Sequence, residues 1–121
     1  MSESELPAID ATAFATLEEI ADGDNEFMAE LLNQYLIDAV QLIDVLAPAL
    51  ESSNALDLER AAHTLKSSSA NVGAMTLSDL CEDLQCIGRS GDLGEAASKV
   101  PLAIAEYARV CDELKARLEK L

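Results

Sequence analysis

Apolar residues recur along this chain at intervals of three and four positions, which is the spacing of one face of an α-helix. No run alternates between apolar and polar residues for long, as an exposed strand would. The longest stripe predicts a helix that Asp24 or Asn25 caps and that Pro48 bends or ends, because proline removes a helical hydrogen bond. Its apolar members are Met28, Leu32, Tyr35, Ala39, Leu42 and Leu46.

A shorter apolar stripe precedes this helix. It predicts a short helix that starts near Asp10, ends around Ala21 and carries Phe14, Leu17 and Ile20 on one side.

Three further helices follow the long one. Asn54 can cap the first of them, which stops at Gly73, because glycine readily adopts the left-handed conformation that ends helices. Thr76 can cap the next helix, over residues 75–89, and a last helix follows the loop at 90–94. Four long helices with short connections predict an all-α fold: an antiparallel four-helix bundle with an additional short N-terminal helix across one end.

The composition fits one acidic domain. The chain has 121 residues, which is the size of one domain. We expect a flexible N-terminal arm over residues 1–8 and a single helical bundle over 9–121. The chain has 23 acidic and 8 basic residues, a formal net charge of -15. Such a charge repels phosphate backbones and anionic lipids, so we expect neither nucleic acid nor a membrane as partner, and a soluble monomer.

The sequence says less about the cellular location of the protein and about the role of its cysteines. The N-terminal sequence MSESELP lacks the order of a signal peptide, and no stretch approaches the ~20 apolar residues that cross a bilayer. We therefore expect a cytoplasmic protein. Cys81, Cys86 and Cys111 are odd in number and lack CxxC spacing, so the sequence suggests neither a disulfide framework nor a zinc site.

The only histidine lies on the polar side of its helix. At about 100° per residue, five residues fall within about 40° of one line and form the core stripe. His63 lies roughly 140° from that line, which predicts a solvent-facing ring. Its neighbours one turn away are small or polar, so the ring is open to a large partner. The core stripe comprises Leu58, Ala62, Leu65, Ser69 and Val72, and the neighbours of His63 comprise Glu59, Lys66, Ser67 and Ala70.

Several chemistries do not fit this histidine. A di-iron bundle needs a second histidine, Ser67 lacks the companions of a Ser–His hydrolase, and no glycine-rich nucleotide loop is present, so we expect no kinase activity. A neutral imidazole can instead attack an activated phosphoryl group, with Lys66 offsetting the charge on the oxygens. The simpler alternative, an exposed histidine of no special function, stays open at this point.

Residues 63–74, HTLKSSSANVGA, resemble the signature of histidine-containing phosphotransfer (HPt) domains, the four-helix intermediates of two-component phosphorelays. His63, Lys66 and Gly73 match the family pattern, whereas Ser67 stands where the family usually has glycine. The resemblance implies that His63 accepts the phosphoryl group and that Lys66 lies near its oxygens. It also implies that Gln85, 22 residues after His63, accepts a hydrogen bond from the other ring nitrogen.

The resemblance further implies the partners. These are response-regulator receiver domains and a hybrid sensor histidine kinase, with Mg²⁺ bound to the receiver, so that neither a metal nor another cofactor belongs to this chain. A histidine-kinase dimerisation helix fits less well, because Thr64 follows the histidine and no proline lies between His63 and Pro101. A non-catalytic acidic adaptor, for which His63 would be dispensable, remains the alternative function. The expected docking residues are Glu59, Ser67, Ala70, Asn71 and Ile37.

Overall fold

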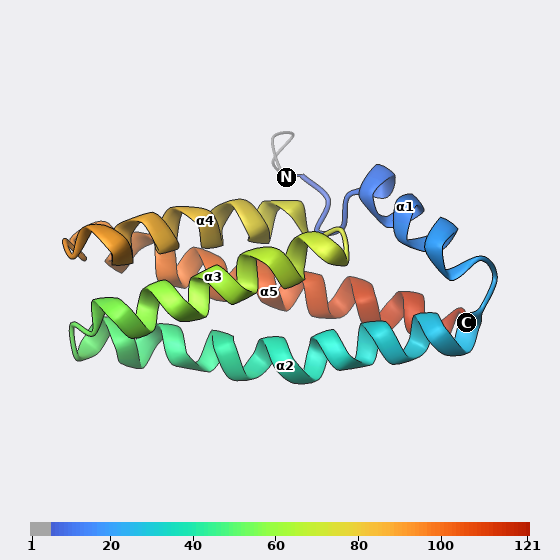
Figure 1. Ribbon diagram of the computed structural model, residues 1–121, viewed down its shortest axis with the longest axis horizontal. Coiled ribbons are helices and arrows are strands. Elements are labelled where there is room, and N and C mark those ends of the chain that lie inside the picture. Colours follow the sequence, from blue (N-terminus) through green and yellow to red (C-terminus); the bar gives the residue numbers. More distant parts are fainter. Residues whose placement is uncertain (1–5) are drawn as a thin grey trace.

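A computed structural model describes residues 6–121, and over this range the chain forms α-helices and no strands (Figure 1). The helices are α1 (Ala11–Ala21), α2 (Asn25–Glu51), α3 (Ala55–Asn71), α4 (Met75–Ser90) and α5 (Ala96–Glu119).

The flexible arm expected over residues 1–8 falls mostly on residues 1–5, which lie outside the described part of the chain. Within that part, Arg109 donates a hydrogen bond to the Leu6 carbonyl at 2.6 Å, and the side chain of Ala8 is buried. The segment that leads into α1 therefore contacts the bundle.

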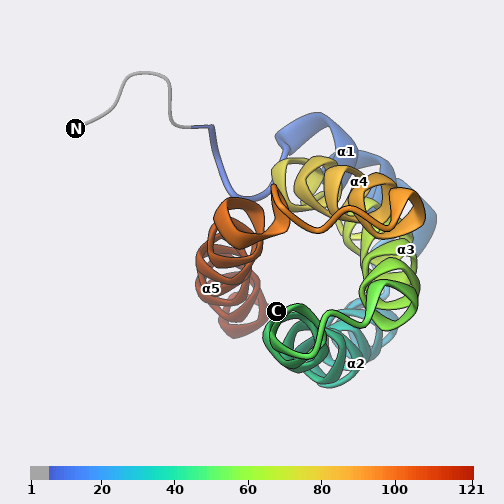
Figure 2. The ribbon, with the colours of Figure 1, turned by 90° about the vertical axis from the view of Figure 1, so that its left-hand side faces the viewer.

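The long helices form a ring in which each one packs against two neighbours. Viewed along the bundle, α2, α3, α4 and α5 follow one another around a common core (Figure 2). Short connections reverse the chain direction at each step, and α1 packs across one end against α2 and α3. The predicted antiparallel four-helix bundle with a short N-terminal helix is thus confirmed.

Side-chain caps begin three of the helices where the sequence suggested. Asp10, Asp24 and Asn54 each accept a hydrogen bond from the backbone N–H three residues on, which satisfies a donor that the helix leaves unpaired. Thr76 was expected to cap α4, and this is wrong: Ala74 precedes the helix, and Thr76 lies inside its first turn.

Gly73 connects α3 to α4 and also anchors α1. Its φ of 87° is in the left-handed region, as predicted for the end of a helix, although α3 itself ends at Asn71. The Gly73 carbonyl accepts a hydrogen bond from Asp10 N at 2.7 Å, and a Cβ at Gly73 would lie 3.3 Å from the backbone nitrogen of Phe14. A larger residue would push α1 away from this connection.

The buried faces follow the predicted stripes with two corrections. Ile20 is 67% exposed, because Phe14, Leu17 and Ala21 form the face of α1 that packs on the bundle. On α2 the buried face is wider than one stripe, since this helix contacts both α3 and α5; Ile43 is buried and Leu42 only partly so. Pro48 does not end α2, which continues to Glu51.

Candidate functional site

The histidine lies on the open face of α3, as predicted. All of the expected core residues of this helix are buried, whereas His63, Ser67 and Asn71 are exposed at successive turns. Small side chains follow the ring along this face, so a large surface can approach it.

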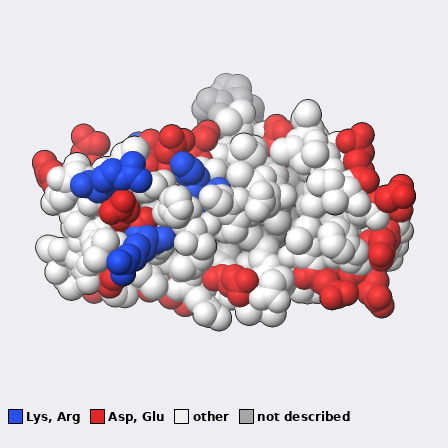
Figure 3. Space-filling model, in the orientation of Figure 1, with Lys and Arg blue, Asp and Glu red and all other residues white. Residues whose placement is uncertain are grey.

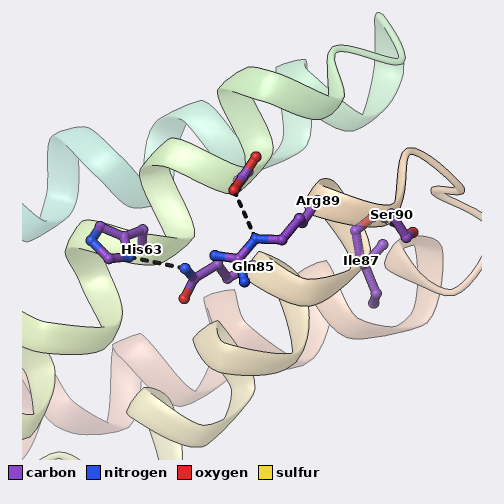
Figure 4. A network of polar contacts seen from close by, with 6 residues as sticks. His63, Gln85, Ile87, Arg89 and Ser90 are labelled. Carbon is purple, nitrogen blue, oxygen red and sulfur yellow. Dashed lines mark hydrogen bonds and ion pairs between the residues drawn. The ribbon is translucent and has the colours of Figure 1, made fainter.

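One ring nitrogen of His63 is held by the neighbouring helix. Gln85 Nε2 of α4 lies 3.0 Å from His63 Nδ1, and the Gln85 side chain is buried (Figure 4). In this orientation the amide donates to an unprotonated Nδ1; turned by 180°, its oxygen accepts from a protonated Nδ1. Within residues 6–121, Nε2 makes no hydrogen bond.

An ion pair lies one turn away from this hydrogen bond. Arg89 Nε donates to Glu59 Oε2 at 3.1 Å (Figure 4). Glu59 precedes His63 by four residues on α3, and Arg89 follows Gln85 by four residues on α4. Because the two helices are antiparallel, the two polar contacts form successive cross-links between α3 and α4.

Gly88 lets the two helices approach closely beside these cross-links. A Cβ at Gly88 would lie 2.8 Å from the backbone nitrogen of Glu59 and 2.9 Å from the carbonyl oxygen of Ala55. No larger residue fits there without separating α3 from α4. The sequence analysis missed this role; its signal was a glycine inside a helical segment, three residues after Gln85.

A pocket of about 490 Å³ opens beside His63. Of the expected site residues it includes Glu59, His63 and Gln85. Its other lining residues, which sequence reasoning missed, are Leu56, Arg60, Thr64 and Arg89. Leu56 and Arg60 could have been found because both lie within two turns of His63 on α3, whereas finding Arg89 required the register of α4.

The remaining expected site residues lie outside the pocket wall. Lys66 is partly buried one turn beyond His63, and its backbone carbonyl accepts a hydrogen bond from Ser78 of α4 at 2.9 Å. Ser67, Ala70 and Asn71 continue along α3. Ile37 is 55% exposed on α2 and is not brought into the pocket.

Basic side chains gather near this site although the chain is strongly acidic. On the face shown in Figure 3, the Lys and Arg side chains cluster over α3 and α4, and acidic side chains dominate the opposite end. The pocket lining supplies Arg60 and Arg89, and Lys66 follows on α3. The surface around His63 is therefore suited to an anionic group.

No group of three or more His, Cys, Asp or Glu side chains in residues 6–121 is arranged to hold a metal ion. None of the helices there is long and apolar enough to cross a membrane.

The Hpt domain family matches residues 30–121, about three quarters of the chain. The chain belongs to the Hpt domain family. This Hpt chain is 36% identical to histidine-containing phosphotransfer protein 2 of Arabidopsis thaliana over 63 residues, which cover 50% of the chain and 40% of that relative. The chain therefore matches less than half the length of this relative.

The fold of this Hpt chain also matches a solved structure. Its TM-score is 0.87 against the crystal structure of histidine-containing phosphotransfer protein B (HptB) from Pseudomonas aeruginosa PAO1, at 26% identity over 97% of this chain and 99% of that one. The family resemblance of residues 63–74 is thus confirmed.

Proposed function

We propose that this Hpt chain relays a phosphoryl group between receiver-domain aspartates, carrying it on Nε2 of His63. The observation that supports this most directly is the state of the ring: Gln85 holds Nδ1, and Nε2 is free of hydrogen bonds within residues 6–121. A nucleophile needs an exposed lone pair and a fixed orientation. The ring of His63 is held by Gln85, and Nε2 has the lone pair when the Gln85 amide oxygen accepts from a protonated Nδ1.

The transfer step follows from this arrangement. Nε2 attacks the phosphorus of an aspartyl phosphate, the N–P bond forms as the P–O bond breaks, and the carboxylate leaves with the bonding electrons. The proton on Nδ1 stays on the ring, which becomes positively charged. With its amide oxygen turned to Nδ1, Gln85 accepts a hydrogen bond from this proton and stabilises the charged ring. The reverse step returns the group to a second aspartate.

The charges near the histidine suit this step. Lys66, one turn away, would offset the negative charge of the transferred oxygens. Mg²⁺ bound to the receiver would neutralise charge on the donor side, and this chain would supply no metal ligand. The partners are accordingly receiver domains of response regulators and of a hybrid sensor kinase, which dock over His63 and the small residues that follow it.

A transfer assay tests the proposal. Receiver domains labelled with radioactive phosphate on aspartate are mixed, with Mg²⁺, with the wild-type chain or with the His63→Gln variant. Because the chain has a single histidine, acid-labile and base-stable label on the wild type reports on one site. We expect label on the wild type only.

The folded state of the variant is the control. An exposed side chain contributes little to stability, so His63→Gln should melt within a few degrees of the wild type. Equal labelling of both proteins would contradict the proposal. If no receiver labels the folded wild type, the non-catalytic adaptor becomes the better account.

A further inference from the structure

We propose that the Ser67 hydroxyl binds the phosphoryl group on His63 and lengthens the lifetime of the phosphohistidine. The inference rests on the proposed function, because it concerns the group that His63 carries. Three serines follow Lys66 in the chain, and the structure gives each of them a different environment. They are Ser67, Ser68 and Ser69.

Two of these serines have hydroxyls that are already bound. The Ser69 side chain is buried, and its Oγ lies 2.8 Å from the Tyr35 hydroxyl of α2. Ser68 is partly buried, and its Oγ donates to the Leu65 carbonyl of the same helix at 3.4 Å. Ser67 is exposed, and its hydroxyl makes no hydrogen bond within the described part of the chain. Ser67 is therefore the serine of the three whose hydroxyl is available to a bound group.

The free end of the His63 ring lies on the same side as Ser67. Nδ1 faces Gln85, and Nε2 lies at the opposite end of the ring (Figure 4). The pocket that includes Gln85 reaches no α3 residue beyond Thr64, so Gln85 approaches the ring from the side of the earlier turns. Nε2 is therefore turned toward the later part of α3, where Ser67 comes one turn after His63.

A phosphoryl group on Nε2 comes within reach of this hydroxyl. On a helix, residues four apart lie on the same face, with their Cβ atoms about 5–6 Å from each other. The phosphoryl oxygens extend beyond Nε2 and span the remaining gap to Ser67. A serine hydroxyl donates a hydrogen bond, and a phosphoryl oxygen is a strong acceptor. Because the hydroxyl has no internal partner, the new bond breaks no hydrogen bond of the protein.

This hydrogen bond stabilises the phosphohistidine more than the transition state of its hydrolysis. In hydrolysis, water adds its oxygen to phosphorus, the N–P bond breaks, the bonding electrons return to Nε2, and phosphate leaves with the protons of water. The phosphoryl group passes through a loose, metaphosphate-like state, which carries less negative charge than the bound group. A donor to its oxygens therefore binds the phosphohistidine more strongly and slows the loss of phosphate.

A small phosphodonor allows a test without any receiver. The zwitterionic form of phosphoramidate has an ammonium group bonded to phosphorus. His63 Nε2 attacks the phosphorus, the new N–P bond forms as the old one breaks, and ammonia leaves with the bonding electrons and its three protons. After the reagent is removed, phosphorus NMR follows the decay of the phosphohistidine at neutral pH. The chains compared are the wild type, Ser67→Ala, Ser67→Thr and Ser67→Val.

The threonine and valine variants form the decisive pair, because the two side chains have nearly the same shape and differ in the hydroxyl. We expect the half-life of the phosphohistidine to be about fivefold shorter in Ser67→Ala and Ser67→Val than in the wild type, the loss of one hydrogen bond. Ser67→Thr, which keeps the hydroxyl, should have a half-life close to that of the wild type.

An exposed serine on α5 supplies the matched control. Ser98→Ala should lose phosphate at the wild-type rate. Since Ser67 is exposed, its variants should melt within a few degrees of the wild type, which circular dichroism measures.

Three results would overturn the inference. The first is a Ser67→Ala variant whose phosphohistidine lasts as long as that of the wild type, or longer. The second is an equal half-life in Ser67→Thr and Ser67→Val, as expected if the side chain only shields the N–P bond from water. The third is a wild type on which phosphoramidate forms no phosphohistidine. Failure of the proposed function would appear separately, as a wild type that phosphoramidate labels and phosphorylated receivers do not.

Discussion

At the scale of single residues, the His63 ring is fixed from one side and open on the other. Helical spacing alone was enough to predict that the ring faces solvent, because 140° from the core stripe leaves no other direction. Spacing was not enough to predict its contact with Gln85, since the hydrogen bond depends on how α4 is shifted against α3. The family resemblance suggested the pair, and the geometry brings the two side chains within 3.0 Å.

The role of Gln85 can be separated from its burial. Gln85→Leu keeps a side chain of similar volume in this buried position but removes the hydrogen bond to Nδ1. We expect the free energy of unfolding to change by less than about 1.5 kcal/mol. Transfer from a phosphorylated receiver should slow about tenfold, the value of one hydrogen bond in the transition state.

Gln41→Leu, at an exposed position of α2, is the matched control for this measurement. Stopped-flow or quench-flow transfer kinetics should give the wild-type rate for this variant. A Gln85→Leu variant that transfers as fast as the wild type would show that Gln85 does not orient the ring.

At the scale of elements, the site depends on how closely α3 and α4 pack. Gly88 permits that approach, and the hydrogen bond and the ion pair cross the same interface. The sequence predicted the glycine that ends α3, because Gly73 follows the last apolar position of the stripe. Gly88 could not be predicted in the same way, since the atoms that forbid a Cβ there belong to another helix. The cap predicted at Thr76 is also wrong. The chain turns at Gly73 and α4 begins directly after Ala74, so Thr76 already lies inside the helix.

Gly88→Ala should therefore damage both the fold and the site. Its Cβ would lie 2.8 Å from the Glu59 backbone nitrogen, so the helices must separate. We expect a loss of about 1–3 kcal/mol in the free energy of unfolding, despite the better helix propensity of alanine. Urea titration followed by circular dichroism measures this loss.

The control for this prediction is Cys86→Ala, an exposed position on the same helix. It should leave the urea midpoint nearly unchanged. If Gly88→Ala were as stable as the wild type, the close approach of α3 and α4 would not be a requirement of the fold.

At the scale of the whole molecule, helix order and core faces followed from the apolar pattern. The predicted buried face was wrong where the apolar pattern fits more than one face of a helix. Ile20 is the example: it was expected on the buried side of α1, but α1 contacts the bundle through one narrow face that leaves Ile20 exposed. The core also contains side chains whose pKa values are raised, chiefly because they are buried. Burial raises the pKa of the Cys81 thiol from 9.0 to about 12, and it raises the pKa values of the Tyr35 and Tyr107 hydroxyls as well.

These raised pKa values predict a loss of stability in alkali. Below the ordinary pKa values, the folded and unfolded chains hold the same protons on these groups, so their contribution does not vary. Above about pH 9 the unfolded chain releases protons that the folded chain keeps, so the free energy of unfolding falls as pH rises. The urea midpoint should therefore decrease steadily between about pH 9 and pH 11.

Cys81→Ala should flatten the first part of this decrease, since the thiol has the lowest ordinary pKa of the three groups. Cys86→Ala, which alters an exposed thiol, should retain the wild-type slope. A midpoint that stays constant over this range would mean that the three groups are not buried in solution as described.

The claim at the centre of this account is that the phosphoryl group is carried on Nε2 of His63, because Gln85 occupies Nδ1. The most direct test is to phosphorylate the wild-type chain with a phosphorylated receiver domain and to identify the phosphohistidine isomer by phosphorus and nitrogen NMR. The account predicts a single species with phosphorus bonded to Nε2. Phosphorus on Nδ1, or on any residue other than His63, would contradict it.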